Sequence, residues 1–160
     1  MSEKVFLNLE RMMPELEDYE ERGVFTKNEL LKIVETRKKH EFRLQRVDKK
    51  LMDFIKYIQS ETSLEKIRDK RLRKHNLKNT HQDKKISKRV VLLYKLALEK
   101  FNEKDLLVDF TEYAKKKDLL FDLKDVYASC CLKNPLDVDL WIFCASNLFE
   151  MEEIDGARAL

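Results

Sequence analysis

The side chains best suited to a chemical task in this 160-residue sequence are the lysines and arginines near its middle. Residues 66–89 hold eleven basic and two acidic side chains, a net charge of +9, whereas the whole chain carries only +3. Lysine and arginine neutralise nucleic-acid phosphates without reading base sequence. The stretch is therefore a candidate for phosphate contacts with RNA, through Lys70, Arg71, Arg73 and Lys74.

Two simpler interpretations of the basic run stay open. It can be a solvated helix end, or a nuclear localisation signal around "DKRLRKH" at residues 69–75. No Phe, Tyr or Trp occurs between residues 66 and 89, so stacking of RNA bases on protein rings is not indicated.

Other reactive residue types do not form a recognisable site. Cys130, Cys131 and Cys144 are odd in number and form no Cys-x-x-Cys motif, which favours a reducing compartment over a disulfide framework or zinc site. The sequence contains no glycine-rich phosphate loop, nucleophile elbow or paired-carboxylate motif. We therefore expect no catalytic residue, cofactor, metal or small-molecule substrate. No stretch is apolar enough for a membrane span, so we expect no membrane partner.

Composition predicts that these residues are carried on helices. Charged residues make up 39% of the chain, and 2 Gly and 2 Pro are too few for the turns of a many-stranded fold. We expect an all-α protein with an N-terminal helical domain at residues 1–83, whose last part is basic. An α-solenoid of helix-turn-helix repeats is expected to follow at residues 84–160. Residues 76–83, "NLKNTHQD", read as the linker.

The first helix is predicted to pack part of one apolar seam inside its own domain, and the alternative is that the seam docks a partner helix. Apolar residues of the segment 2–21 are spaced 4, 3, 4 and 3 apart, namely Val5, Leu9, Met12, Leu16 and Tyr19. So few helices cannot bury every apolar side chain on this segment, and exposed ones would mark a binding surface. The candidate partner face is Phe6, Met13, Leu16 and Tyr19. The next helix should start at "FTKNEL", residues 25–30, where Thr26 and Glu29 fit a capping box.

The second half of the sequence repeats itself. Five apolar positions from Val90 to Leu98 recur at an offset of 33, and three from Leu106 to Phe110 recur at 34. A period of this length is typical of stacked helix pairs. The predicted packing residues are Tyr94, Leu107, Phe110, Tyr127 and Trp141. The last unit is expected to be truncated, with the array continuing past residue 160.

Trp141 lies in a segment that is apolar nearly all round a helix. In a stacked array an inner helix is covered on most sides, so Trp141 is predicted to be buried between layers. On that interpretation its replacement by alanine would cost several kcal/mol.

The repeats resemble a known class. "VYASCCLKNP", residues 126–135, followed by "DLWIFCASNLFE", residues 139–150, is similar to the half-a-tetratricopeptide repeat. Trp141 and Leu107 hold its Trp position, whereas Cys144 departs from its aromatic position. The resemblance implies a protein of an RNA-processing machine.

The N-terminal part resembles the U3 small nucleolar RNA-associated protein 6 family. The motifs that carry the resemblance are "MPELE" (13–17), "FTK" (25–27), "EFRLQR" (41–46) and "FIKYIQ" (54–59). The family implies a nucleolar, non-catalytic scaffold subunit of the small-subunit processome, acting in pre-ribosomal RNA processing beside β-propeller subunits. It implies association with U3 small nucleolar RNA and pre-ribosomal RNA, at least indirectly. The alternatives are direct RNA binding by residues 66–89, or a repeat scaffold of a splicing or 3′-end cleavage machine.

Overall fold

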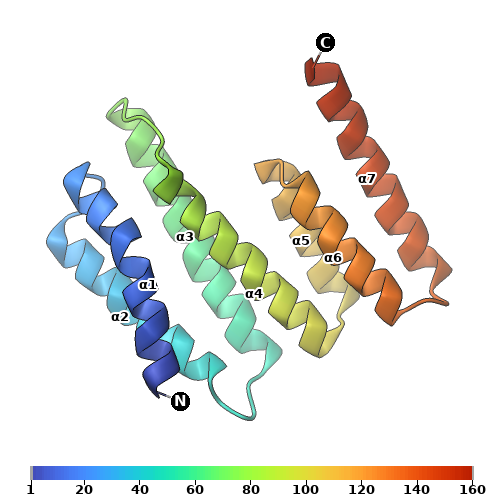
Figure 1. Cartoon of the computed structure of the whole chain (residues 1–160), viewed down its shortest axis with the longest axis horizontal. Helices are drawn as coiled ribbons and strands as arrows, with labels where there is room; N and C mark the ends of the chain where they lie inside the picture. The colour runs from blue at the N-terminus through green and yellow to red at the C-terminus, as the bar shows by residue number, and fades with distance from the viewer. Residues whose placement is uncertain (1, 160) are drawn as a thin grey trace. The chain divides into compact units, whose positions relative to one another are not determined.

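The structure is a computed structural model that describes the backbone of residues 2–159 and the side chains of residues 2–152. Across these residues every regular element is helical, which confirms the all-α prediction (Figure 1). The elements in chain order are α1 (Ser2–Glu21), α2 (Lys27–Leu44), α3 (Leu51–Lys74), the 3₁₀ helix η1 (His81–Lys84), α4 (Lys85–Phe101), α5 (Lys104–Lys117), α6 (Leu120–Lys133) and α7 (Val138–Ala159).

The chain divides into two compact units, Met1–Leu93 and Tyr94–Leu160, called unit 1 and unit 2 below. The expected domain boundary at residue 83 falls at the end of η1, whereas the compact division lies inside α4. The first turns of α4 belong to unit 1 because Arg89 binds carboxylates of α1 and α3 there.

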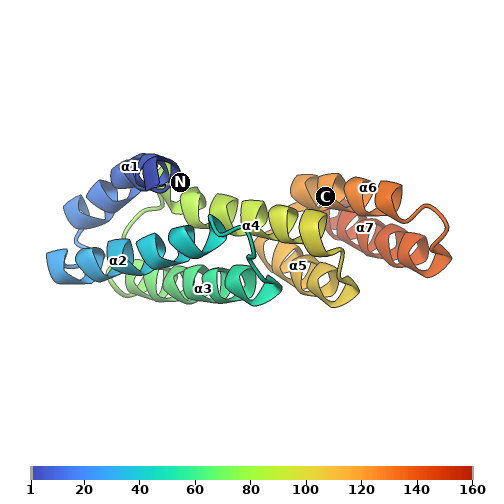
Figure 2. The same cartoon turned by 90° about the horizontal axis from the view of Figure 1, so that it is seen from below.

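Unit 1 is built from two adjacent helices with a third packed over them. Figure 2 shows α2 and α3 in one layer and α1 in the other. Gly23 makes the turn from α1 to α2 with a φ of 70°, a left-handed conformation that glycine adopts without steric cost. The predicted capping box then starts α2, because Glu29 N donates to Thr26 Oγ1 and Thr26 N donates to Glu29 Oε2.

The apolar core of unit 1 includes two residues that were predicted to face a partner. Leu16 and Tyr19 are 4% and 0% exposed, and they pack with the buried side chains of Val24, Phe25, Leu30 and Leu72. The assignment of Leu16 and Tyr19 to a partner face is therefore wrong. They lie on the same side of α1 as Val5 and Met12, and this side faces the interior.

The segment predicted to be a linker is fixed to α1. Arg22 Nη1 donates to the carbonyl of Lys78 at 3.1 Å, and Arg22 Nη2 lies 2.7 Å from the Asp83 carboxylate. Thr80 Oγ1 donates to Asp18 at 3.1 Å. Residues 76–83 thus form an anchored connection, held by polar contacts that an apolar pattern does not reveal.

Unit 2 contains helix pairs with equivalent interiors. Tyr94 and Tyr127, which are 33 positions apart, are both buried, and so are Phe110 and Cys144. Tyr94 packs against Phe110 with ring centroids 5.2 Å apart. The carboxamides of Asn102 and Asn134 donate to each other at 3.1 and 3.0 Å at the same end of α4 and α6. Equivalent positions of neighbouring helical repeats within unit 2 therefore meet, as expected of a repeat-like fold.

Trp141 is not buried, unlike Leu107 at the equivalent position of the preceding repeat. Leu107 is 3% exposed, whereas Trp141 is 48% exposed, so the predicted burial of Trp141 is wrong for the described chain. Leu107 lies on α5, which has α6 beside it, while α7 is the last helix that the structure describes. Within the described residues no helix is sufficiently long and apolar to cross a bilayer.

Candidate functional site

The most polar part of the interior is a cluster of Glu15, Arg37, Glu61 and Arg89, called the four-charge cluster below. Arg37 lies 2.9 Å from Glu15 and 2.8 Å from Glu61. Arg89 lies 3.1 Å from each of the same two carboxylates. Each residue comes from a different helix of α1–α4, and the two negative charges balance the two positive ones.

The electrostatics of this cluster indicate a structural role. Burial alone would raise the pKa of Glu15, but the charges of Arg37 and Arg89, with their hydrogen bonds, hold it below its usual value. Burial would lower the pKa of Arg37, but the two carboxylates raise it. Glu15 and Arg37 are therefore stabilised in their charged forms by their partners in the cluster, which is typical of a structural ion-pair network.

Several residues of the basic run 66–89 point into the fold. Arg68 is 4% exposed, and its Nη1 donates to the carbonyl of Asp83 at 2.7 Å while its Nη2 binds Asp69 at 2.8 Å. Arg89 belongs to the four-charge cluster. The +9 of the linear sequence thus overstates the charge that unit 1 presents to a ligand.

Arg71 also has an internal role. Its guanidinium makes a two-pronged contact with the Glu29 carboxylate at 2.7 and 2.9 Å, and lies 5.0 Å from the ring centroid of Phe25. The hydrogen bond from Arg71, with that from the backbone of Thr26, lowers the pKa of Glu29 to about 2. Arg71 therefore joins α3 to the start of α2 and is a poor phosphate ligand.

The other three candidate phosphate ligands are available. Lys70, Arg73 and Lys74 are exposed near the end of α3, and none forms an ion pair with a described residue. They lie on two sides of the helix, because Arg73 is rotated by about 100° from Lys74.

Phe6 and Met13 remain as candidate partner contacts, at 49% and 44% exposure. Phe42, which is not among the predicted partner contacts, joins them at 38% exposure. Its ring meets that of Phe6 edge to face at 6.3 Å, and Lys38 Nζ lies 5.6 Å from the Phe6 centroid. Phe6, Met13 and Phe42 are called the α1–α2 apolar face below.

The pairing of α1 with α2 explains why Phe42 was missed. Asn8 donates to Glu41, and Glu15 binds Arg37, so the two helices run antiparallel. Phe6 and Phe42 are thereby brought together across 36 positions of sequence. Phe42 lies in the segment "EFRLQR", residues 41–46, but no local sequence signal links it to Phe6.

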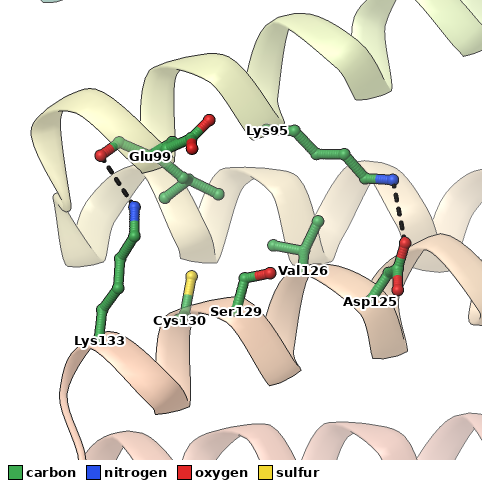
Figure 3. A pocket seen from close by; sticks show the side chains of 8 residues that line it. Lys95, Glu99, Asp125, Val126, Ser129, Cys130 and Lys133 are labelled. Atoms are coloured by element: carbon green, nitrogen blue, oxygen red, sulfur yellow. Dashed lines mark hydrogen bonds and ion pairs between the residues drawn. The ribbon is translucent and has the colours of Figure 1, made fainter.

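Unit 2 contains a groove of about 290 Å³ between α4 and α6 (Figure 3). Its apolar floor includes Leu98 and Val126. On its rim Lys95 pairs with Asp125 at 3.4 Å, and Lys133 donates to the carbonyl of Glu99 at 2.8 Å.

Burial raises the pKa of the Cys130 thiol, which also lines this groove, so the thiolate is disfavoured. The groove can accept an apolar side chain but holds no activated nucleophile. No group of three or more potential metal ligands occurs among the described residues.

Comparisons with known proteins match the whole chain. The family model described as U3 small nucleolar RNA-associated protein 6 matches residues 9–91, which corresponds to most of unit 1. A Schizosaccharomyces pombe protein named U3 small nucleolar RNA-associated protein 6 is 34% identical over 164 residues. That similarity covers 100% of this chain and 34% of the relative, so the chain spans about a third of the relative's length.

Proposed function

Because this chain belongs to the U3 small nucleolar RNA-associated protein 6 family, we propose that it is a non-catalytic scaffold subunit of the small-subunit processome. In this role it acts in the nucleolus, in pre-ribosomal RNA processing and small ribosomal subunit biogenesis. Its partners are other processome subunits, including β-propeller proteins, and it associates with U3 small nucleolar RNA and pre-ribosomal RNA. The names of the family and of the relative support the link to U3 small nucleolar RNA.

The observation that carries the scaffold role is the α1–α2 apolar face. Aromatic and methionine side chains are enriched at protein–protein interfaces, and here three of them are exposed on one side of unit 1. The four-charge cluster ties all four helices beneath them. A binding surface on a fixed framework loses less conformational entropy when it docks, which favours a scaffold.

A second candidate function is direct RNA binding by unit 1. It is favoured by the exposure of Lys70, Arg73 and Lys74, which carry charge that no described residue neutralises. A scaffold of a splicing or 3′-end cleavage machine is less well supported, because the N-terminal family match concerns a U3-associated protein.

The test is affinity purification of the tagged protein from its own cells, with identification of the proteins and RNA that accompany it. The double variant Phe6→Ala/Met13→Ala should lose propeller subunits and U3 RNA. The matched control is Val47→Ala/Met52→Ala, which removes two other exposed apolar side chains of unit 1, at 94% and 52% exposure. This control should retain both. Recovery of splicing or cleavage factors instead of U3 RNA would contradict the proposal.

A further inference from the structure

The outer side of α2 and α3 carries two parallel rows of cations. Three contacts set the alignment of the helices, between Glu29 and Arg71, Arg37 and Glu61, and Glu41 and Tyr57. From the first contact to the third, the α2 residue lies progressively nearer the end of α2, while the α3 residue lies progressively nearer the start of α3. The helices therefore run antiparallel and side by side, as Figure 2 shows.

Helical spacing places the row on α2. Lys32, Thr36, Lys39 and Arg43 are separated by 4, 3 and 4 positions, which keeps them on one side of the helix. Lys32, Thr36 and Lys39 are exposed and Arg43 is half-buried. Glu35, also exposed, borders this row.

The row on α3 follows the same spacing. Lys56, Lys70 and Lys74 share one side of α3 with Ser60, Ser63 and Ile67, at steps of 4, 3, 4, 3 and 4. The three lysines are exposed. From Lys56 to Lys74 the row extends for about 27 Å, at 1.5 Å per residue.

The electrostatics beneath the rows agree with this placement. Burial lowers the pKa of His40, and the positive charge of Arg43 lowers it further, as does that of Lys56. Glu61 and Glu41 act in the opposite direction without reversing the shift. One histidine between the helices is therefore close to a cation from each row, in agreement with the antiparallel pairing of α2 and α3.

We propose that Lys32, Lys39, Arg43, Lys56, Lys70 and Lys74, called the α2–α3 basic face, bind the phosphate backbone of RNA. The six residues form no ion pair with any described residue. Four of them lie outside the basic run 66–89, and the run's lysines at positions 78, 84 and 88 lie outside the face. The site is thus defined by the surface of two helices and not by the linear charge count.

The composition of this face favours RNA over protein. Protein interfaces are depleted of lysine and enriched in aromatic residues, whereas nucleic-acid interfaces are strongly positive. The two rows that hold the α2–α3 basic face contain no aromatic side chain, and Ile67, at 46% exposure, is the one apolar residue in them. Binding should therefore be insensitive to base sequence and strongly dependent on salt.

Two triple variants of the full chain separate the face from the linear run. Lys32→Ala/Lys39→Ala/Lys56→Ala removes three charges from the face but none from residues 66–89. Lys78→Ala/Lys84→Ala/Lys88→Ala removes three exposed charges from the run but none from the face. The two variants change the net charge equally, so any difference between them reports position.

Affinity for a short RNA duplex is measured by fluorescence anisotropy over a range of salt concentrations. Each lost phosphate contact reduces the slope of log affinity against log salt by about one. The face variant should therefore lose about three from this slope, and the run variant less than about one. Replacement of the same three face residues by arginine should retain the slope, and far-UV circular dichroism checks folding.

Other outcomes overturn the inference. An equal or larger loss in the run variant would assign RNA binding to the linear stretch. Unchanged slopes in both variants would exclude this face. Poly-glutamate that displaces the duplex at equal charge concentration would indicate an acidic protein ligand. The inference rests on the proposed place in an RNA machine, but recovery of processome proteins by the tagged chain tests that role separately.

Discussion

The two units of this chain stabilise helices by different means. All buried charged side chains among the described residues lie in unit 1, where Glu15, Arg37, Glu61 and Arg68 are at most 4% exposed. The interior of unit 2 is apolar in its described part, with Thr111 as its buried polar side chain, hydrogen-bonded to Tyr127. Unit 1 therefore combines an apolar core with buried ion pairs, whereas the described part of unit 2 relies on apolar contacts.

The difference suits different kinds of assembly. A buried ion pair adds little net stability, but losing one partner is costly, so it penalises wrong helix alignments. Unit 1 joins four unlike helices once, and the four-charge cluster is satisfied in one arrangement. Unit 2 repeats apolar contacts at a constant offset in sequence, which lets neighbouring helical repeats pack in the same way.

The largest expected loss of stability follows from a substitution in the four-charge cluster of unit 1. Arg37→Ala leaves two buried carboxylates with one arginine, so it should lower the free energy of unfolding by about 3–5 kcal/mol. Hydrogen exchange of unit 1 amides measures this loss. Arg46→Ala removes an exposed charge of the same type and should change little. A loss from Arg37→Ala as small as that from Arg46→Ala would show that the cluster does not hold the helices.

In unit 2 the effect should depend on which repeat is changed. Leu107→Ala creates a cavity in the interior and should cost about 2–5 kcal/mol. Trp141→Ala at the equivalent position should cost less than about 1 kcal/mol, because the ring is half-exposed. Urea unfolding followed by circular dichroism compares the two. Equal losses would mean that Trp141 is covered by a surface that the described residues do not provide.

The smallest expected effect is a difference between the two units in how their stability depends on pH. The pKa values of Glu15 and Glu29 are lowered by folding, so their contribution is present above the unfolded value near 4.5 and is lost as pH falls below it. As the pH is lowered from about 5 to about 2, unit 1 amides should therefore lose hydrogen-exchange protection before unit 2 amides do. Loss of protection in unit 2 first would contradict the assignment of acid sensitivity to these carboxylates.

Local patterns in the sequence predicted the elements well. The capping box at Thr26 is confirmed, and the helical period of apolar residues anticipated an all-α chain. These features depend on residues a few positions apart. The repeat offset likewise follows from residues of the same type recurring in order, and Tyr94 and Tyr127 are both interior.

Contacts between distant residues could not be read in the same way. Glu15 and Arg89 are 74 positions apart, and each looks like an ordinary surface charge in its own segment. Arg71 was counted with Lys70 and Lys74, yet its side of α3 meets Glu29. The sequence shows how many charges a stretch carries, but only helix packing decides which of them reach solvent.

The four-charge cluster also sets where this chain can be cut for expression. A fragment that ends at residue 83, at the apparent linker, lacks Arg89 and keeps two carboxylates for one arginine. Extending it to Leu93 restores the second arginine and the neutral balance. Fragment design should therefore treat the first turns of α4 as the last part of the N-terminal unit.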